Sequence, residues 1–498
     1  MRGPVNLEGR AGASRRRSPA GSVRGVVSVL VVVVVLAAAW TTAFVRGDLH
    51  GWFGGDQRPS VPTDVAPPTE VRLPVPRVAQ PVLGQPSGPP LRPAAVRRVL
   101  SPLLKDSALG GHVGIEVRDL THARTVLRLG HGSFTPASTL KLFTTTAALK
   151  VLGPDHRFTT STILLRRARV PKLVLVGGGD PLLALRKAKP SVDTYPQPAT
   201  LAALAARTAR ALRAVGTTRV RLGYDASRFT GPSASPTWPP SYIGSFVVSP
   251  VSALWVDEGV LPSGYRRAAD PPLAATEAFA QLLRAHGIHI QGVPAATSVA
   301  AARTPGAATG PLAQVQSAPL AAIVQHTLEQ SDNDAAEVLL RQLAIGTGRR
   351  ASFAGGVAAL RQVLVGLGVP WRGLRVYDGS GLSRHDRVTT SAVSTVLRLA
   401  STGPAAIRTV ATGLPVAGFD GSLESRFFAP GTRAALGVVR AKTGTLTGVS
   451  GLAGLVVDRS GTPLSFVALL DRVPVSSTLA ARTGLDRIAA ALAGCGCP

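Results

Sequence analysis

Hydrophobic and polar residues recur along the chain with different periods, and these periods predict its elements. Residues 25–45 form an unbroken run without a charged residue, long enough to cross a bilayer as a helix. Residues 94–104 repeat with a helical period, and the apolar runs 113–117 and 125–129 predict a hairpin of strands. The next segment, residues 136–152, predicts a helix that ends before Gly153 and Pro154.

The rest of the chain divides into a middle region and a C-terminal region of different character. The middle, residues 160–315, holds short β-like runs such as 173–176, proline-rich loops and a predicted helix at 273–286. After it, the chain returns to the helix and strand pattern of the first region. The elements expected there are a helix over 320–343 interrupted at 331–333, a hairpin of strands at 449–457 and 464–470, and a closing helix at 477–492 with a serine cap.

This order predicts an α+β protein, in which an antiparallel sheet flanked by helices is interrupted by an inserted, largely β domain. Eleven prolines between Pro59 and Pro93 indicate a semi-rigid, extended linker before the folded part. The expected organisation is a basic tail at 1–24, a membrane segment at 25–45, a linker at 46–93, a catalytic domain at 94–159 and 316–498, and an inserted domain at 160–315.

Arginines crowd the first 24 residues, which carry one acidic residue, Glu8. The positive-inside rule places this tail in the cytoplasm and the chain after Arg46 outside. We favour a single-pass membrane anchor, but cleavage after Ala39 would make the same segment a signal peptide and the protein secreted. Both alternatives export the folded part.

The net charge of +28 suggests polyanionic partners, but the arginines are dispersed, the aromatic content is 5%, and no nucleic-acid-binding motif is present. We therefore expect no nucleic acid. Cysteine occurs only at Cys495 and Cys497, which provide no disulfide framework and no metal-ligand cluster. We expect a mobile terminus with two incidental thiols, no metal and no cofactor.

A candidate nucleophile lies at Ser138, three residues before Lys141, so the two side chains share a helix face. Serine needs a base to take its proton, and a buried lysine can be that base if its pKa falls by about 3 units. Only seven of the 55 basic residues are lysine. Since arginine does not deprotonate in proteins, a retained lysine at this position indicates a need for a neutral amine.

Two further motifs follow in order, Ser331-Asp332-Asn333 and Lys442-Thr443-Gly444-Thr445. Together with S-x-x-K they form the signature of penicillin-binding proteins and class A β-lactamases. In this chemistry Ser138 forms an acyl ester after Lys141 removes its proton, Ser331 relays the proton to the leaving amine, and Asn333 holds Lys141 and the substrate peptide. Lys442, Thr443 and Thr445 would bind a substrate carboxylate, and Gly444 lets the strand approach closely, so that the N–H groups of Ser138 and Thr445 form an oxyanion hole.

From Arg97 to Leu492 the chain resembles the D-alanyl-D-alanine carboxypeptidase/endopeptidase family of low-molecular-mass class C penicillin-binding proteins. The similar stretches beyond the three motifs are 134–141, 152–158, 176–181, 250–259, Asp378-Gly379-Ser380-Gly381-Leu382-Ser383 and 414–423. The resemblance implies a β-lactamase-like transpeptidase domain, peptidoglycan stem peptides as substrates and β-lactam antibiotics as covalent inhibitors. Asp334 departs from the apolar residue common there, and we expect a local effect at most.

Two other functions remain open from the sequence. A serine β-lactamase would share the motifs but needs a deacylating glutamate paired through E-x-x-x-N, and only Glu329 with Asn333 has that spacing. A membrane protein that binds wall peptides or β-lactams without catalysis is the second alternative. The sequence does not choose between carboxypeptidase and endopeptidase cleavage.

Overall fold

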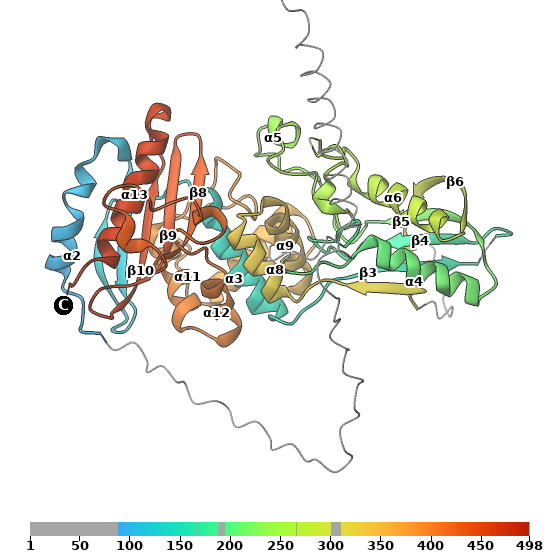
Figure 1. Ribbon diagram of the computed structural model, residues 1–498, viewed down its shortest axis with the longest axis horizontal. Coiled ribbons are helices and arrows are strands. Elements are labelled where there is room, and N and C mark those ends of the chain that lie inside the picture. Colours follow the sequence, from blue (N-terminus) through green and yellow to red (C-terminus); the bar gives the residue numbers. More distant parts are fainter. Residues whose placement is uncertain (1–87, 167, 188–194, 265, 300–309, 498) are drawn as a thin grey trace, which may run out of the picture. The chain divides into compact units, whose positions relative to one another are not determined.

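The structure, a computed structural model, describes residues 88–497 except 167, 188–194, 265 and 300–309 (Figure 1). The basic tail, the membrane segment and nearly all of the proline-rich linker lie outside the described residues, so those predictions stay predictions. Among the residues that are described, we find no helix with the length and apolar character needed to cross a bilayer.

The first sheet is antiparallel and is built from both ends of the described chain. Its strand order is β2-β1-β10-β9-β8, and β1 pairs with β10 from Val113 opposite Leu470 to Asp119 opposite Leu464. Helices α2 and α13 cover one face, while α11 and α3 lie on the other (Figure 1). The strands are β1 (Val113–Asp119), β2 (Arg124–Leu129), β8 (Arg440–Leu446), β9 (Val449–Val457) and β10 (Pro463–Leu470), and the first pair of helices is α2 (Pro93–Leu100) and α13 (Thr478–Ala493).

Coverage on both faces explains the composition of the central strands. A sheet with one solvated face alternates apolar and polar residues, whereas strands buried on both faces form nearly continuous apolar runs. In β10 every residue from Leu464 to Leu470 is buried, and in β9 burial is nearly as complete. These two strands therefore form the middle of the core.

A group of helices lies on the α11 side of this sheet and packs mainly around α3. They are α3 (Lys141–Leu152), α8 (Leu320–Glu329), α9 (Asn333–Gly346), α10 (Phe353–Gly366), α11 (Thr390–Thr402) and α12 (Ala405–Thr412). Helix α3 contacts all the others, and its residues from Lys141 to Leu149 are buried on every side. Such burial suits its sequence, which is apolar or threonine-rich all round and has no polar face. Helix α3, which directly follows the turn that carries the candidate nucleophile, therefore lies at the centre of this group of helices.

The second sheet is formed by the part of the chain from β3 (Thr159–Leu165) to β7 (Ala313–Gln316), and its strand order is β6-β5-β4-β3-β7. Strands β4 (Lys172–Val176), β5 (Arg219–Asp225) and β6 (His289–Ala296) pair in parallel. Parallel neighbours need crossover connections, and helices α4 (Leu201–Ala214) and α6 (Pro271–Ala285) provide them. The expected α+β architecture is confirmed, and the inserted region holds more helix than the largely β domain we expected.

The C-terminal tail differs from the prediction. Cys495 and Cys497 are joined by a disulfide, and both side chains are buried against α2 and α13. The backbone N–H of Arg92 donates to the Cys497 carbonyl at 2.9 Å. The expectation of a mobile terminus with two free thiols is therefore wrong. Ser477 precedes α13 as predicted, but its side chain makes no capping hydrogen bond.

Candidate active site

The candidate nucleophile lies in a tight turn at the start of α3. Ser138 belongs to a 3₁₀ turn, Ala137–Leu140, and the α-helix proper starts at Lys141. Gly381 packs against this turn with φ +84°, and a Cβ there would collide with the Ala137 carbonyl. The close approach fixes the turn so that the Ser138 hydroxyl lies above the helix and remains partly exposed.

Lys141 is fully buried and has three hydrogen-bond acceptors around its amine. Nζ lies 2.8 Å from Ser138 Oγ, 2.7 Å from Asn333 Oδ1 and 3.1 Å from the Ser380 carbonyl oxygen. Burial lowers the pKa of Lys141 to about 8, although nearby carboxylates, Asp332 foremost, favour the charged form. The predicted pairing of serine and lysine is present, with the lysine in an environment that makes proton loss feasible near neutral pH.

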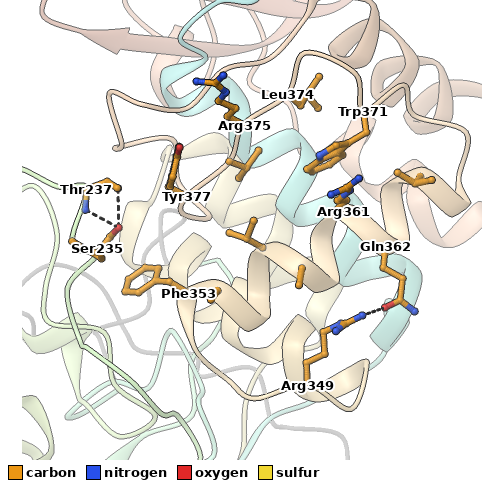
Figure 2. A pocket seen from close by; sticks show the side chains of 16 residues that line it. Ser235, Thr237, Arg349, Phe353, Arg361, Gln362, Trp371, Leu374, Arg375 and Tyr377 are labelled. Carbon is orange, nitrogen blue, oxygen red and sulfur yellow. Dashed lines mark hydrogen bonds between the residues drawn. The ribbon is translucent and has the colours of Figure 1, made fainter.

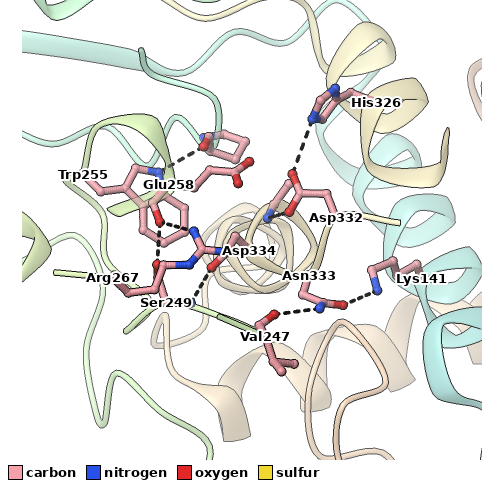
Figure 3. Close-up of polar contacts among 12 residues, drawn as sticks. Lys141, Val247, Ser249, Trp255, Glu258, Arg267, His326, Asp332, Asn333 and Asp334 are labelled. Atoms are coloured by element: carbon pink, nitrogen blue, oxygen red, sulfur yellow. Dashed lines mark hydrogen bonds and ion pairs between the residues drawn. The ribbon is translucent and has the colours of Figure 1, made fainter. Parts of the chain in front are cut away.

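The loop between α8 and α9 carries the second motif (Figure 3). Ser331 adopts φ +57°, a left-handed conformation rare for residues other than glycine. Asp332, not Ser331, caps α9 through its side chain, which excludes a helix-capping role for Ser331. Asn333 turns its amide oxygen toward Lys141 and donates from Nδ2 to the carbonyl oxygen of Val247, in the inserted region, at 2.8 Å.

The third motif brings a second buried lysine to the same place. Lys442 Nζ donates to Ser331 Oγ at 2.8 Å and to the Thr443 carbonyl at 3.2 Å. Burial, with the nearby charge of Lys141 as a smaller cause, lowers the pKa of Lys442 well below its usual value. Each of the two buried lysines thus forms a hydrogen bond with one serine hydroxyl.

The rest of this motif follows β8 along the edge of the first sheet. Thr443 Oγ1 lies 3.1 Å from Ser422 Oγ, and Thr445 is exposed. A Cβ on Gly444 would come within 2.7 Å of the Pro136 carbonyl oxygen, so glycine permits the strand to pass beside the nucleophile turn. On the outer edge of β8 Arg440 bridges to Val416, and the Ala441 N–H donates to the Pro415 carbonyl oxygen at 3.0 Å. The edge beyond Ala441 is open among the described residues.

Several residues that support the lysine were not predicted. The Glu337 carboxylate accepts the backbone N–H of Ser380 at 2.8 Å, and Asp378 accepts Trp238 Nε1–H, from the inserted region, at 2.7 Å. These bonds hold the segment whose carbonyl at Ser380 faces Lys141. Burial raises the pKa of Glu337 to about 8. The block at 378–383 was noted for its resemblance without a role, and nothing in the sequence singles out Glu337.

Asp334 has a larger effect than expected. Its carboxylate accepts the Ser249 N–H at 2.7 Å and pairs with Arg267 Nη2 at 2.9 Å, and both charged side chains are nearly buried (Figure 3). Since Ser249 and Arg267 belong to the inserted region, the Asp334 carboxylate links that region to α9. The expectation of a purely local effect is wrong.

A separate cavity of about 980 Å³ opens between α10 and the segment 371–377 (Figure 2). Apolar side chains such as Phe353 and Trp371 line it, with arginines among them. Neither Ser138 nor either motif lysine lines this cavity. The cavity is therefore distinct from the site described above.

Comparison with known proteins gives a consistent result. The sequence profile of the family described as D-Ala-D-Ala carboxypeptidase 3 (S13) matches residues 96–265 and 262–492. The chain is 34% identical over 495 residues to carboxypeptidase DacB of Mycolicibacterium smegmatis, covering 97% of this chain and 98% of that protein. It is 32% identical over 463 residues to the D-alanyl-D-alanine carboxypeptidase of an Actinomadura species, covering 77% of this chain and 82% of that one.

Among solved structures, penicillin-binding protein 4 of Haemophilus influenzae superposes with a TM-score of 0.63 at 20% identity. The match covers 79% of this chain and 97% of that one. At this identity the likeness concerns the fold, and it agrees with the predicted transpeptidase-like architecture.

Proposed function

The chain belongs to the D-Ala-D-Ala carboxypeptidase 3 (S13) family, and from this membership we propose that it hydrolyses peptidoglycan stem peptides through an ester on Ser138. The activity of the family, serine-type D-Ala-D-Ala carboxypeptidase, is that of this chain. The observation that supports the assignment of the nucleophile is the 2.8 Å contact between its hydroxyl and the buried amine of Lys141.

In the first step the neutral amine of Lys141 takes the Ser138 proton as Oγ attacks the carbonyl carbon of the penultimate D-alanine. The fall of the lysine pKa to about 8 makes roughly a tenth of the amine available at pH 7. Asn333 and the Ser380 carbonyl keep the amine pointed at the hydroxyl. The N–H groups of Ser138 and Thr445 would stabilise the oxyanion that forms.

In the second step the C–N bond to the terminal D-alanine breaks and its nitrogen needs a proton. Ser331 Oγ, bonded to Lys442, is the hydroxyl that can pass that proton from the protonated Lys141 to the amine. Water then attacks the acyl ester, releases the shortened peptide and restores the Ser138 hydroxyl.

Substrate binding follows from the open edge of β8. An extended peptide can add to an exposed sheet edge through main-chain hydrogen bonds, with side-chain pockets supplying specificity. Such a peptide would place its terminal carboxylate toward the amine of Lys442 and the hydroxyls of Thr443 and Thr445. A β-lactam presents a carboxylate and a strained amide to the same groups, so we expect it to acylate Ser138.

A β-lactamase needs a rapid deacylation device, and the pair with the right spacing does not form one. Glu329 Oε1 accepts from Gln325 Nε2 at 2.7 Å, while the Asn333 amide is bonded to Lys141 and Val247. We therefore expect a slowly released penicilloyl ester.

For localisation, we propose that residues 25–45 hold the enzyme at the membrane with the folded part outside. The support is the uncharged run and the arginines that precede it. Detection of the mature N-terminus by mass spectrometry distinguishes an anchor from a cleaved signal peptide.

The function is tested by release of D-alanine from a diacetylated tripeptide ending in D-Ala-D-Ala. The wild type and Lys150→Arg, an exposed change on α3, should release D-alanine, and Ser138→Ala should not. Incubation with penicillin followed by intact-mass measurement and peptide mapping should place a stable adduct on Ser138. An adduct on another residue, or turnover of nitrocefin at many cycles per second, would contradict the proposal.

A further inference from the structure

Three side chains of metal-ligating types converge at Asp332, the residue of the second motif to which no catalytic step was assigned (Figure 3). Glu258 comes from a 3₁₀ turn of the inserted region, His326 from the last turn of α8, and Asp332 from the loop between α8 and α9. One ligand atom of each lies within 4.8 Å of the others. The cluster therefore joins the inserted region to the end of α8 and the loop that follows it.

One oxygen of the cluster has no hydrogen-bond partner among the described residues. Oδ2 of Asp332 is buried and accepts no hydrogen bond, while its side chain is 7% exposed. His326 Nε2 lies 3.6 Å from this oxygen, and the side chain of Glu258 also interacts with Asp332. A buried carboxylate oxygen without a donor is costly, and a bound cation is one way to satisfy it.

The distances suit a small cation. Zn²⁺ binds imidazole nitrogen and carboxylate oxygen at about 2.0–2.2 Å, so two ligands in a tetrahedral site are roughly 3.3 Å apart. The 3.6 Å separation of His326 and Asp332 is near that value, and a ligand oxygen of Glu258 lies within 4.8 Å of both. The imidazole favours Zn²⁺ or a similar transition metal over Mg²⁺ and Ca²⁺, which prefer oxygen ligands.

The surroundings give a cation access to the cluster, and the neighbouring cationic side chain competes little for the carboxylates. A cavity of about 300 Å³, lined by Glu258, His326 and Tyr195 among others, opens onto the cluster. The neighbouring guanidinium of Arg267 is occupied by Asp334 and the Glu258 carbonyl oxygen. Glu258 also has φ +54°, so its backbone holds a conformation that non-glycine residues seldom adopt.

We propose that Glu258, His326 and Asp332 bind one divalent transition-metal cation, which clamps the inserted region to the loop that carries Ser331 and Asn333. The cation would cross-link two parts of the chain, and its place is structural because none of its ligands contacts the reacting atoms. Loss of the cation should loosen the loop without removing any of the catalytic side chains.

The test uses the full chain, purified in detergent with its disulfide intact, stripped with a chelator and then dialysed against Zn²⁺. Bound metal is measured by plasma mass spectrometry, and thermal unfolding is recorded with and without metal. The variants are His326→Ala and Glu258→Gln, and the matched control is His289→Ala, which removes an exposed histidine of β6.

We expect one Zn²⁺ per chain in the wild type and the control, with a Tm raised by a few degrees, and affinity at least about tenfold weaker in both cluster variants. Equal binding in all four proteins, or no binding by the wild type, would overturn the site. Equal affinity for Mg²⁺ would overturn the choice of metal.

Labelling of Ser138 by penicillin checks that each variant is folded. If a cluster variant fails that check, a Co²⁺ titration of the wild type decides whether the metal site exists. Intense visible absorption from a four- or five-coordinate ion supports the site, and the weak spectrum of a hydrated ion refutes it. Metal binding requires no turnover, so these outcomes are independent of the proposed peptidase activity.

Discussion

The buried amine of Lys141 predicts a steep pH dependence of acylation. A pKa of about 8 leaves roughly a tenth of the amine neutral at pH 7, whereas an ordinary lysine would be roughly 0.03% neutral there. Burial therefore increases the fraction of neutral lysine at pH 7 by about 300-fold, which is equivalent to about 3 kcal/mol. Since the neutral form is the base, acylation must increase as the pH rises through the pKa.

The assay is the rate of covalent labelling by a fluorescent penicillin between about pH 6 and pH 9. We expect the rate to rise nearly tenfold per pH unit below about pH 8 and then to level off. The midpoint belongs to the pair of lysines, because the pKa of Lys442 is lowered partly by the charge of Lys141.

Lys141→Arg is the decisive variant. Arginine keeps a positive charge at the site but does not deprotonate, so labelling should fall by at least about 10³-fold at every pH. Lys150→Arg, on the exposed side of the same helix, should keep the wild-type profile. A labelling rate independent of pH below 8, or rapid labelling of Lys141→Arg, would refute the assignment of Lys141 as the base.

Three further changes test the architecture. Gly444→Ala brings a Cβ within 2.7 Å of the Pro136 carbonyl oxygen, and we expect slower penicillin labelling with little change in circular dichroism, whereas an unchanged rate would contradict the tight approach. Asp334→Ala leaves the nearly buried Arg267 without its partner and should lower the free energy of unfolding by about 3–5 kcal/mol in a denaturant titration, a loss that Arg267→Met should partly reverse. Phe143→Ala empties a fully buried position in α3 and should cost about 3–5 kcal/mol, so a loss below about 1 kcal/mol would mean that the core closes around the gap.

The chemistry of the site was predictable because it depends on residue types at fixed spacing. Ser138 and Lys141 are neighbours on one turn, so local geometry alone brings them together. The apolar strand runs near the C-terminus likewise predict β9 and β10, since burial on both faces leaves little room for polar residues. Local rules thus account for these elements.

The supporting bonds were not predictable because they depend on how distant segments meet. Trp238 reaches Asp378 and Val247 reaches Asn333 only after the inserted region packs against α9. No periodicity or spacing encodes such pairings. The two C-terminal cysteines were also misjudged, because they are buried in a hydrophobic cluster shared with distant residues such as Val96 and Leu100 of α2, and short-range patterns do not contain such neighbours.

The bonds of Lys141 also bear on how the enzyme matures. Its partners Asn333 and Ser380 lie 192 and 239 residues away in the sequence. Lys442, which donates a hydrogen bond to Ser331, lies 111 residues after that serine. A nascent chain that has exposed its serine still lacks the neighbours that tune the base, and the last of them arrive with β8 (Arg440–Leu446). Reactivity toward penicillin is thus a property acquired only after β8 has been made and has packed beside the serine, and labelling of newly made protein would report that packing.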